Sequence, residues 1–391
     1  MFQPLSSRMQ SVQSPIIPIV GDLIRQTPGT ISLGQGVVYY GPPAQAIAQI
    51  TESMSEPLFH RYQAVQGILP LRELIQAKLN LENRIAIADL DQIVVTAGSN
   101  MGFMNAVLAI TQPGDQIILL APYYFNHEMA ITIAGCQPVV VETDANYQLL
   151  LTAIAAAITS KTRAIVTISP NNPTGVVYPE SSLRQVNQLC QEHGLYHISD
   201  EAYEYFTYDG AQHFSPGAIA EGTDQTISLF SLSKAYGFAS WRIGYMVIPA
   251  HLSLAVQKIQ DTILICPPVV SQYAALGALQ VGVCYCQDKR VAIAQVRQLM
   301  LEALQELTDI CTIPTATGAF YFLLRVYTPL PAMTVVQRLI QDYQVAVIPG
   351  DTFGLTGCYL RVAYGALTQA TASEGIERLV KGLRAIVLKL P

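Results

Sequence analysis

The stretch SLFSLSKAYGFASWRIGY, residues 228–245, places two cations in an otherwise apolar part of the chain. Lys234 lies among small hydroxylated residues, and Arg242 follows it eight positions later. The pattern predicts a strand, a loop and a second strand. A lysine that loses its water near another cation has a lowered pKa and becomes a nucleophilic amine. The alternative is that Lys234 extends its ammonium group to the surface.

The composition indicates a large buried core and excludes several classes of function. The chain has 391 residues, of which 51% are hydrophobic and 13% charged. A net charge of −6 without a basic cluster argues against nucleic-acid binding. No apolar run approaches the roughly 20 residues of a spanning helix, and no signal peptide is evident. Seven cysteines without metal-binding spacing predict reduced thiols, no metal site and a cytoplasmic location.

The order of apolar runs predicts two structural regions. From about residue 45 to residue 280, seven β-rich runs alternate with helical patterns, which indicates a mostly parallel α/β sheet. After residue 280 the pattern changes to a smaller α+β arrangement. We expect a large domain over residues 45–285, and a small domain formed by residues 1–44 and 286–391. The first 45 residues are predicted to be an extended arm and loop.

Polar residues follow the predicted strands, where open α/β sheets bind ligands. Taken singly, each has a simpler explanation: a turn or helix cap at Gly98-Ser99, a tight turn at NNPTG, a helix cap at Asp200, core packing for Tyr124. Because the ends of parallel strands meet at one edge of the sheet, we expect the whole set to converge there. The set is Gly98, Ser99, Asn100, Tyr124, Asn172, Asp200, Tyr203, Ser231, Ser233 and Lys234.

Together these residue types suit a phosphorylated aldehyde cofactor with a pyridine ring. Lys234 would form a Schiff base with the aldehyde. The phosphate would be held by Ser231, Ser233, Arg242 and the helix start at Gly98-Ser99. Asp200 would keep the ring nitrogen protonated, and Tyr124 would stack on the ring. Asn172 and Tyr203 are candidate donors to the ring hydroxyl.

The motifs NNPTG, DEAY, SLSKAYGFASWRIGY and LRVAYG, with LGQG and YQAVQGILPLRELI before them, stand in a recognisable order. In this the chain resembles the class I/II (fold-type I) aminotransferases, which depend on pyridoxal 5′-phosphate. The resemblance covers almost the whole chain. It implies a mostly parallel seven-stranded sheet with helices on both faces, together with a smaller α+β domain.

The resemblance also implies individual roles. Lys234 would carry the cofactor and later move the proton, and Asp200 would pair with the pyridinium nitrogen. Tyr203 and Asn172 would bond the ring oxygen, Tyr124 would stack, and the phosphate would lie among Gly98, Ser99, Asn100, Ser231, Ser233 and Arg242. Tyr62 would reach the neighbouring subunit's phosphate site, implying a homodimer. Arg361 and Gly36, with Asn172, would bind the substrate. The family usually has glycine where this chain has Ser240, which bears on the position of Arg242.

The expected reaction is ping-pong transamination between an amino acid and a 2-oxo acid. No lysine or arginine follows Gly98-Ser99-Asn100 in the next helix, whereas Tyr39 and Tyr40 lie near the presumed substrate mouth. We therefore expect neutral, aromatic or sulfur-containing side chains rather than aspartate. A carbon–sulfur lyase on the same scaffold and a non-catalytic sensor are the alternatives. A nicotinamide dehydrogenase is excluded because no GxGxxG follows the first strand.

Overall fold

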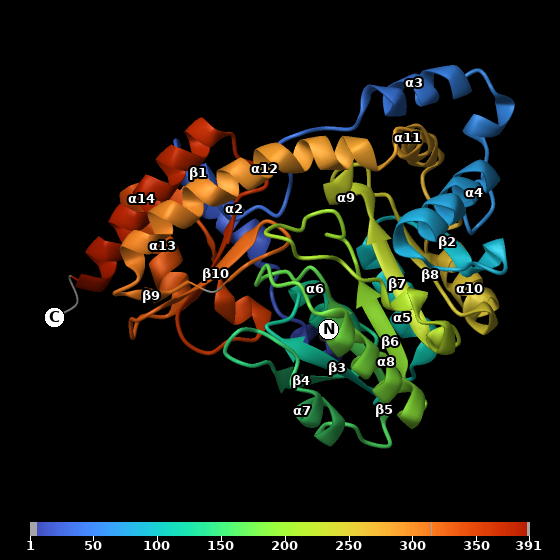
Figure 1. Cartoon of the computed structure of the whole chain (residues 1–391), viewed down its shortest axis with the longest axis horizontal. Helices are drawn as coiled ribbons and strands as arrows, with labels where there is room; N and C mark the ends of the chain where they lie inside the picture. The colour runs from blue at the N-terminus through green and yellow to red at the C-terminus, as the bar shows by residue number, and fades with distance from the viewer. Residues whose placement is uncertain (1–5, 314, 389–391) are drawn as a thin grey trace, which may run out of the picture.

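The computed structural model describes residues 6–313 and 315–388, and its centre is a seven-stranded sheet with the order β2-β8-β7-β6-β5-β3-β4 (Figure 1). The pairs among β3, β4, β5, β6 and β7 are parallel, while β8 runs antiparallel to both neighbours. The predicted mostly parallel seven-stranded sheet is therefore confirmed. The strands are β2 (Ile93–Thr96), β3 (Gln116–Ala121), β4 (Gln137–Glu142), β5 (Thr162–Ile168), β6 (Tyr196–Asp200), β7 (Thr226–Ser231) and β8 (Gly244–Val247).

Helices cover both faces of this sheet because side chains alternate along buried strands. Val94 packs with α5, α6 and α10 on one face, whereas its neighbours Ile93 and Val95 pack with α4 and α11 on the other. Farther along the sheet, α7 and α8 continue the second face. The helices are α4 (Leu69–Lys78), α5 (Ser99–Ile110), α6 (Phe125–Ile133), α7 (Leu151–Ala156), α8 (Glu180–His193), α10 (Ser253–Leu264) and α11 (Val269–Gln280).

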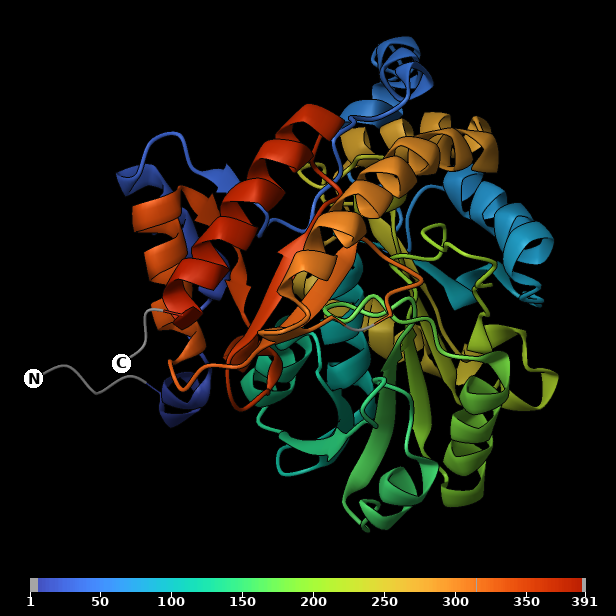
Figure 2. The same cartoon turned by 60° about the vertical axis from the view of Figure 1, so that its left-hand side comes forward.

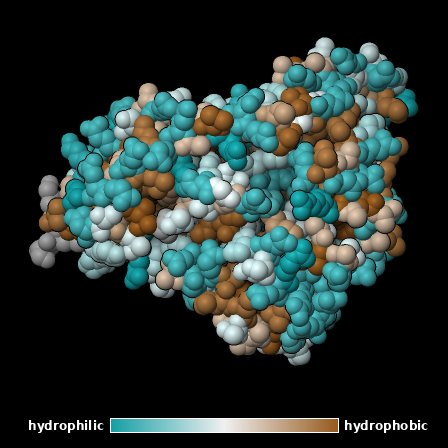
Figure 3. Space-filling view, in the orientation of Figure 1, coloured by the Kyte–Doolittle hydropathy of each residue, from teal (hydrophilic) through white to brown (hydrophobic). Residues whose placement is uncertain are grey.

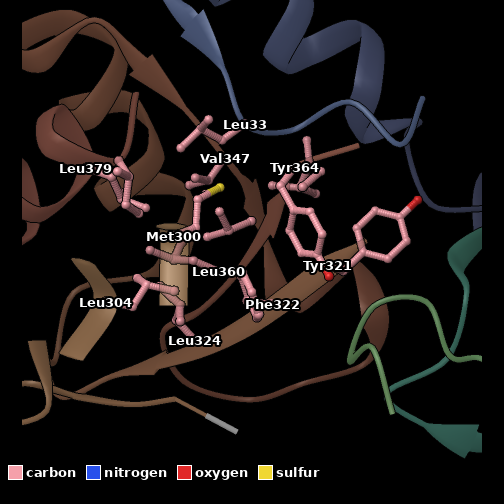
Figure 4. Close-up of a cluster of buried hydrophobic side chains, with 14 of the residues drawn as sticks. Leu33, Met300, Leu304, Tyr321, Phe322, Leu324, Val347, Leu360, Tyr364 and Leu379 are labelled. Atoms are coloured by element: carbon pink, nitrogen blue, oxygen red, sulfur yellow. The ribbon is translucent and has the colours of Figure 1, made fainter. Parts of the chain in front are cut away.

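The C-terminal region builds a second, smaller layer beside the large sheet (Figure 2). Its four-stranded antiparallel sheet has the order β12-β13-β10-β9. Its helices surround an apolar cluster that includes Leu33, Met300 and Leu360 (Figure 4). The elements are α12 (Val283–Leu304), β9 (Cys311–Thr312), β10 (Tyr321–Val326), α13 (Ala332–Tyr343), β11 (Val345–Ala346), β12 (Ile348–Pro349), β13 (Tyr359–Ala363) and α14 (Gln369–Leu388).

The N-terminal segment joins this smaller layer through a parallel pair between β1 (Ile31–Ser32) and β11. It is not the extended arm that the sequence predicted, because residues 6–45 contain α1 (Ser7–Ser11) and α2 (Ile16–Gln26). Ile16 and Val20 bury one face of α2, and Pro18 lies in the first turn, where a missing N–H costs no helix bond. Met1 to Leu5 lie outside the described residues. The domain limits at residues 45 and 285 stay a prediction, and α12 runs across the second of them.

One further helix precedes α4 in the chain. A short helix, α3 (Ala44–Ser53), packs on α11 and projects at the top right of Figure 1. Among the described residues, no single helix is long and apolar enough to cross a bilayer; the pair Val269–Gln280 and Val283–Leu307, bent by 84°, passes that length and composition test when joined.

Candidate active site

A cavity of about 140 Å³ opens at the carboxyl edge of the large sheet. Its lining comes from the ends of β5, β6 and β7, the start of α5 and the loop before α6. All of these residues except Ile168 and Ala202 belong to the predicted set. The lining is Ser99, Asn100, Tyr124, Ile168, Asn172, Asp200, Ala202, Tyr203, Ser231, Ser233, Lys234 and Arg242. The structure therefore gathers residues that lie as far apart in the sequence as Ser99 and Arg242.

Lys234 lies in the short helix α9 (Leu232–Ala235), directly after β7. Its Nζ donates a hydrogen bond to the carbonyl of Gly36 at 2.5 Å. Burial and the positive charges of Arg361 and Arg242 lower the pKa of Lys234 to about 8, against the opposing effect of Asp200. The amine therefore loses its proton near pH 8, more than two pH units below an ordinary lysine.

Hydroxyls and a helix start form an anion cradle at one end of the cavity. Ser231 caps α9 by accepting the backbone N–H of Ser233 at 3.2 Å. Gly98 caps α5 with φ +83°, and a Cβ there would clash with the guanidinium of Arg242. Backbone N–H groups at the start of α5 and the cationic Arg242 suit a phosphate. Ser240 does not displace Arg242, which reaches the cavity from the loop before β8.

Asp200 ends β6 and holds a fixed carboxylate in the cavity wall. It is 5% exposed and accepts the N–H of Ala202 at 3.1 Å. His127, on α6, lies 3.1 Å away through Nε2, and its ring stacks on Phe103 with centroids 3.9 Å apart. Sequence reasoning missed His127, although it stands three positions after Tyr124, the spacing of one helix face.

Each of the three predicted ring contacts, Asn172, Tyr203 and Tyr124, is held by a hydrogen bond. Asn172 Nδ2 donates to the hydroxyl of Tyr203 at 3.3 Å, and that hydroxyl lies 2.7 Å from the hydroxyl of Tyr321. Tyr124 accepts from Asn126 Nδ2 at 2.7 Å, and burial raises the pKa of its hydroxyl. All of these hydroxyls are therefore neutral donors near pH 7. Tyr321 was not predicted from the sequence.

Arg361 places a buried positive charge beside the cavity. It is 2% exposed, and its Nη1 and Nη2 donate to Asn172 Oδ1 at 2.8 Å and to the carbonyl of Gly34 at 2.7 Å. Its guanidinium lies between the rings of Tyr321 and Phe353, at 4.6 and 5.1 Å. Within residues 6–313 and 315–388, no carboxylate pairs with Arg361, and its buried Nε has no hydrogen-bond partner. Such a charge favours an anionic ligand.

Tyr62, a predicted site residue, lies away from this cavity. It is 79% exposed and lies on a separate surface with Phe59, Leu264 and Val270. Gly36 does reach the site region, because its carbonyl accepts from Lys234 and its Cα faces the hydroxyl of Tyr321.

Residues 28–379 match the family described as "Aminotransferase class I and II". The chain is 32% identical to an aromatic aminotransferase of Arabidopsis thaliana, over 99% of this chain and 98% of that one. It is 33% identical to a probable aspartate/prephenate aminotransferase of Thermus aquaticus, over 91% and 86%. The structure of Thermus thermophilus aspartate aminotransferase with maleate superposes with a TM-score of 0.91 at 30% identity, covering 97% and 100%.

The chain therefore belongs to the class I and II aminotransferase family, whose members are enzymes that depend on pyridoxal 5′-phosphate. It has the fold-type I architecture of that family.

Proposed function

We propose that this enzyme binds pyridoxal 5′-phosphate in the cavity and moves the amino group of a neutral or aromatic amino acid to a 2-oxo acid. The observation that carries the proposal is a pair of cations, the buried Arg361 and the cavity-lining Arg242, whose charges both act on Lys234. No carboxylate among the residues that the structure describes pairs with either of them. A cofactor phosphate fits Arg242 and the start of α5, and a substrate carboxylate fits Arg361. When bound, the cofactor supplies an aldehyde and an electron-accepting ring.

The residues of the chain would then divide the work. Arg361 would orient the amino acid by donating two parallel hydrogen bonds to its carboxylate. The Gly34–Gly36 segment supports Arg361, because the carbonyl of Gly34 accepts from its Nη2. Lys234, with a pKa of about 8, takes the proton from the substrate carbon and returns it one position away. Asp200, backed by His127, holds a negative charge against the ring nitrogen. Asn172 and Tyr203 donate to the ring oxygen, and Tyr124 covers one ring face.

The preference for neutral or aromatic substrates is supported by the lining charges. Lys234 and Arg242 are the cations among the lining residues, and both already have roles in holding the cofactor. Asn100, at the start of α5, is neutral and exposed. The relatives bear names of both kinds, aromatic and aspartate/prephenate. We expect kcat/KM for phenylalanine or tyrosine to exceed that for aspartate; a clear excess for aspartate would contradict this preference.

We also propose a homodimer with shared sites. Tyr62 and the exposed apolar residues Leu58 and Val270 lie on one surface near α3 and α11, where apolar colour gathers in Figure 3. An exposed surface of this kind is typical of an interface. A second copy of this chain would cover it and receive Tyr62. Mixing inactive Tyr62→Phe and Lys234→Ala chains should restore part of the activity in the mixed dimer, whereas chains with separate sites would show none. The cytoplasmic location stays a prediction.

The experiment that tests the proposal is a visible absorption spectrum. The purified protein is loaded with the cofactor, and single amino acids are then added without any oxo acid. We expect a visible band when the cofactor is loaded. One group of amino acids should then replace this band with the spectrum of the amine form of the cofactor. A missing band on loading would overturn the cofactor assignment. Release of ammonia without the amine form would instead indicate a lyase.

A further inference from the structure

Tyr321 contacts three residues of the proposed site, although it does not line the cavity. Its hydroxyl lies 2.7 Å from that of Tyr203, and the guanidinium of Arg361 lies 4.6 Å from its ring centroid. A Cβ on Gly36 would clash with the same hydroxyl. Tyr321 is fully buried, at one side of the apolar cluster of the smaller layer (Figure 4). The ring therefore brings one hydroxyl from β10 to the edge of the large sheet.

The neighbouring bonds leave two arrangements for the protons of the tyrosine pair. Arg361 Nη1 donates to Asn172 Oδ1, so the amide nitrogen of Asn172 faces Tyr203 and donates to its hydroxyl oxygen. Tyr203 keeps one proton to donate, either to Tyr321 or into the cavity that it lines. If Tyr203 donates into the cavity, its bond to Tyr321 is satisfied only when Tyr321 is the donor.

We propose that Tyr321 is a positioning residue that donates its hydroxyl proton to Tyr203, and so directs the proton of Tyr203 into the cavity, toward an anionic oxygen of the bound cofactor. This inference rests on the proposed function, because it needs the cofactor oxygen as the final acceptor. Hydrogen bonds in such a chain polarise one another, so that Tyr321 strengthens Tyr203 as a donor.

Both hydroxyls keep their protons near neutral pH, so each of them has a proton to donate. Burial raises the pKa of Tyr321 to about 12, with Arg361 opposing the rise. Burial raises the pKa of Tyr203 well above its usual value, and the neighbouring Tyr321 adds to the rise.

The test follows the pH midpoint of the visible absorption change of the cofactor-loaded protein without substrate. In Tyr321→Phe, Tyr203 is a weaker donor, so more negative charge stays on the cofactor oxygen. That charge holds the titrating proton beside the oxygen more tightly. We expect the midpoint to rise by about 0.5 to 1 pH unit, the size of one hydrogen bond. Tyr203→Phe should raise it further, and the double variant should equal Tyr203→Phe alone. The proposal would be overturned if Tyr321→Phe left the midpoint unchanged. It would also be overturned if the midpoint of the double variant rose above that of Tyr203→Phe by as much as Tyr321→Phe raises that of the wild-type protein.

Two further samples keep the result interpretable. Tyr208→Phe removes a buried hydroxyl that donates to the carbonyl of Ala319 at 2.9 Å, outside the cavity, and should leave the midpoint unchanged. Replacing Tyr321 with 3-fluorotyrosine keeps the hydroxyl but makes it more acidic, and should lower the midpoint; a rise there would contradict the direction of donation. A wild-type protein that gains no visible band would overturn the proposed function itself.

Discussion

His127 lies with Nε2 3.1 Å from a carboxylate oxygen of Asp200, while its ring is stacked flat on Phe103. The stacking fixes the plane of the imidazole, and the imidazole fixes the carboxylate at the end of β6. Asp200 also accepts the N–H of Ala202 at 3.1 Å, so both of its oxygens have protein partners. A buried carboxylate held on two sides keeps its charge in one place.

Asp200→Asn tests the importance of that charge. The amide keeps the size and the bond to Ala202 but loses the negative charge. We expect kcat to fall by about 100- to 1,000-fold, the usual loss when one preorganised electrostatic contact is removed. His127→Leu should give a smaller loss, because the carboxylate remains but is held less firmly. Turnover of Asp200→Asn at the wild-type rate, measured at saturating substrate, would remove Asp200 from its proposed role.

Lys234 is expected to react with the cofactor in a pH-dependent way. Its pKa is lowered to about 8, so the amine is protonated and unreactive below that pH and neutral above it. The rate at which the cofactor-free protein gains a reducible covalent bond to pyridoxal 5′-phosphate should therefore rise with pH and level off above about 8. Lys258→Ala, on the exposed side of α10, should keep this profile, whereas Lys234→Arg should form no bond. Labelling of Lys234→Arg at the same rate would point to another lysine.

Arg361→Lys should separate substrate binding from cofactor binding. Lysine keeps the charge but lacks the planar fork that binds a carboxylate through two parallel bonds. A charged hydrogen bond contributes about 1.5–3 kcal/mol, so KM for the amino acid should rise about 10- to 100-fold. Cofactor affinity, followed by the visible band, should change little. Arg325→Lys, on the exposed face of the neighbouring strand β10, is the matched control and should leave KM unchanged.

The buried His197 should make the free energy of unfolding depend on pH. It is fully buried in β6, bonded to Thr167 Oγ1 at 2.8 Å, and burial lowers its pKa from 6.5 to about 3. A folded pKa below the unfolded one means that the unfolded chain binds the proton more readily. The contribution to stability is therefore present above pH 6.5 and is lost as the pH falls toward 3, by up to about 1.4 kcal/mol per pH unit.

Denaturation of the wild-type protein and His197→Gln at pH 7 and pH 5 measures this effect. The free energy of unfolding of the wild-type protein should decrease more between the two values than that of the variant. Equal slopes would show that His197 does not titrate on unfolding in this range.

Much of the large sheet could be predicted because its strands are short apolar runs with a polar residue at the end. Asp200 and Lys234 each stand at or just after such an end, so their convergence followed from parallel pairing alone. The two-residue strands β11 and β12 stand within a single apolar run, QVAVIPG, at residues 344–350. Strand propensity gives no sign of a break there, since Val347 between them is as apolar as its neighbours.

The missed site residues differ in how far the sequence points to them. His127 lies in the first turn of α6, directly after its N-cap residue Tyr124, and this closeness in sequence was a usable signal. Tyr321 belongs to β10 of the smaller sheet, and its contact with Tyr203 depends on how two separate layers meet. The periodicity of apolar residues along the chain does not predict this contact between the two sheets. The buried face of α2 was overlooked because proline and serine around it are typical of loops.

The segment Gly34–Tyr40 touches both ends of the site. The carbonyl of Gly34 accepts from Arg361, the carbonyl of Gly36 accepts from Lys234, and the hydroxyl of Tyr40 donates to the carbonyl of Lys234 at 2.9 Å. An insertion or deletion in this stretch would shift the contacts of both Arg361 and Lys234. We therefore expect a substrate preference acquired through this stretch to be accompanied by a changed reactivity of the amine.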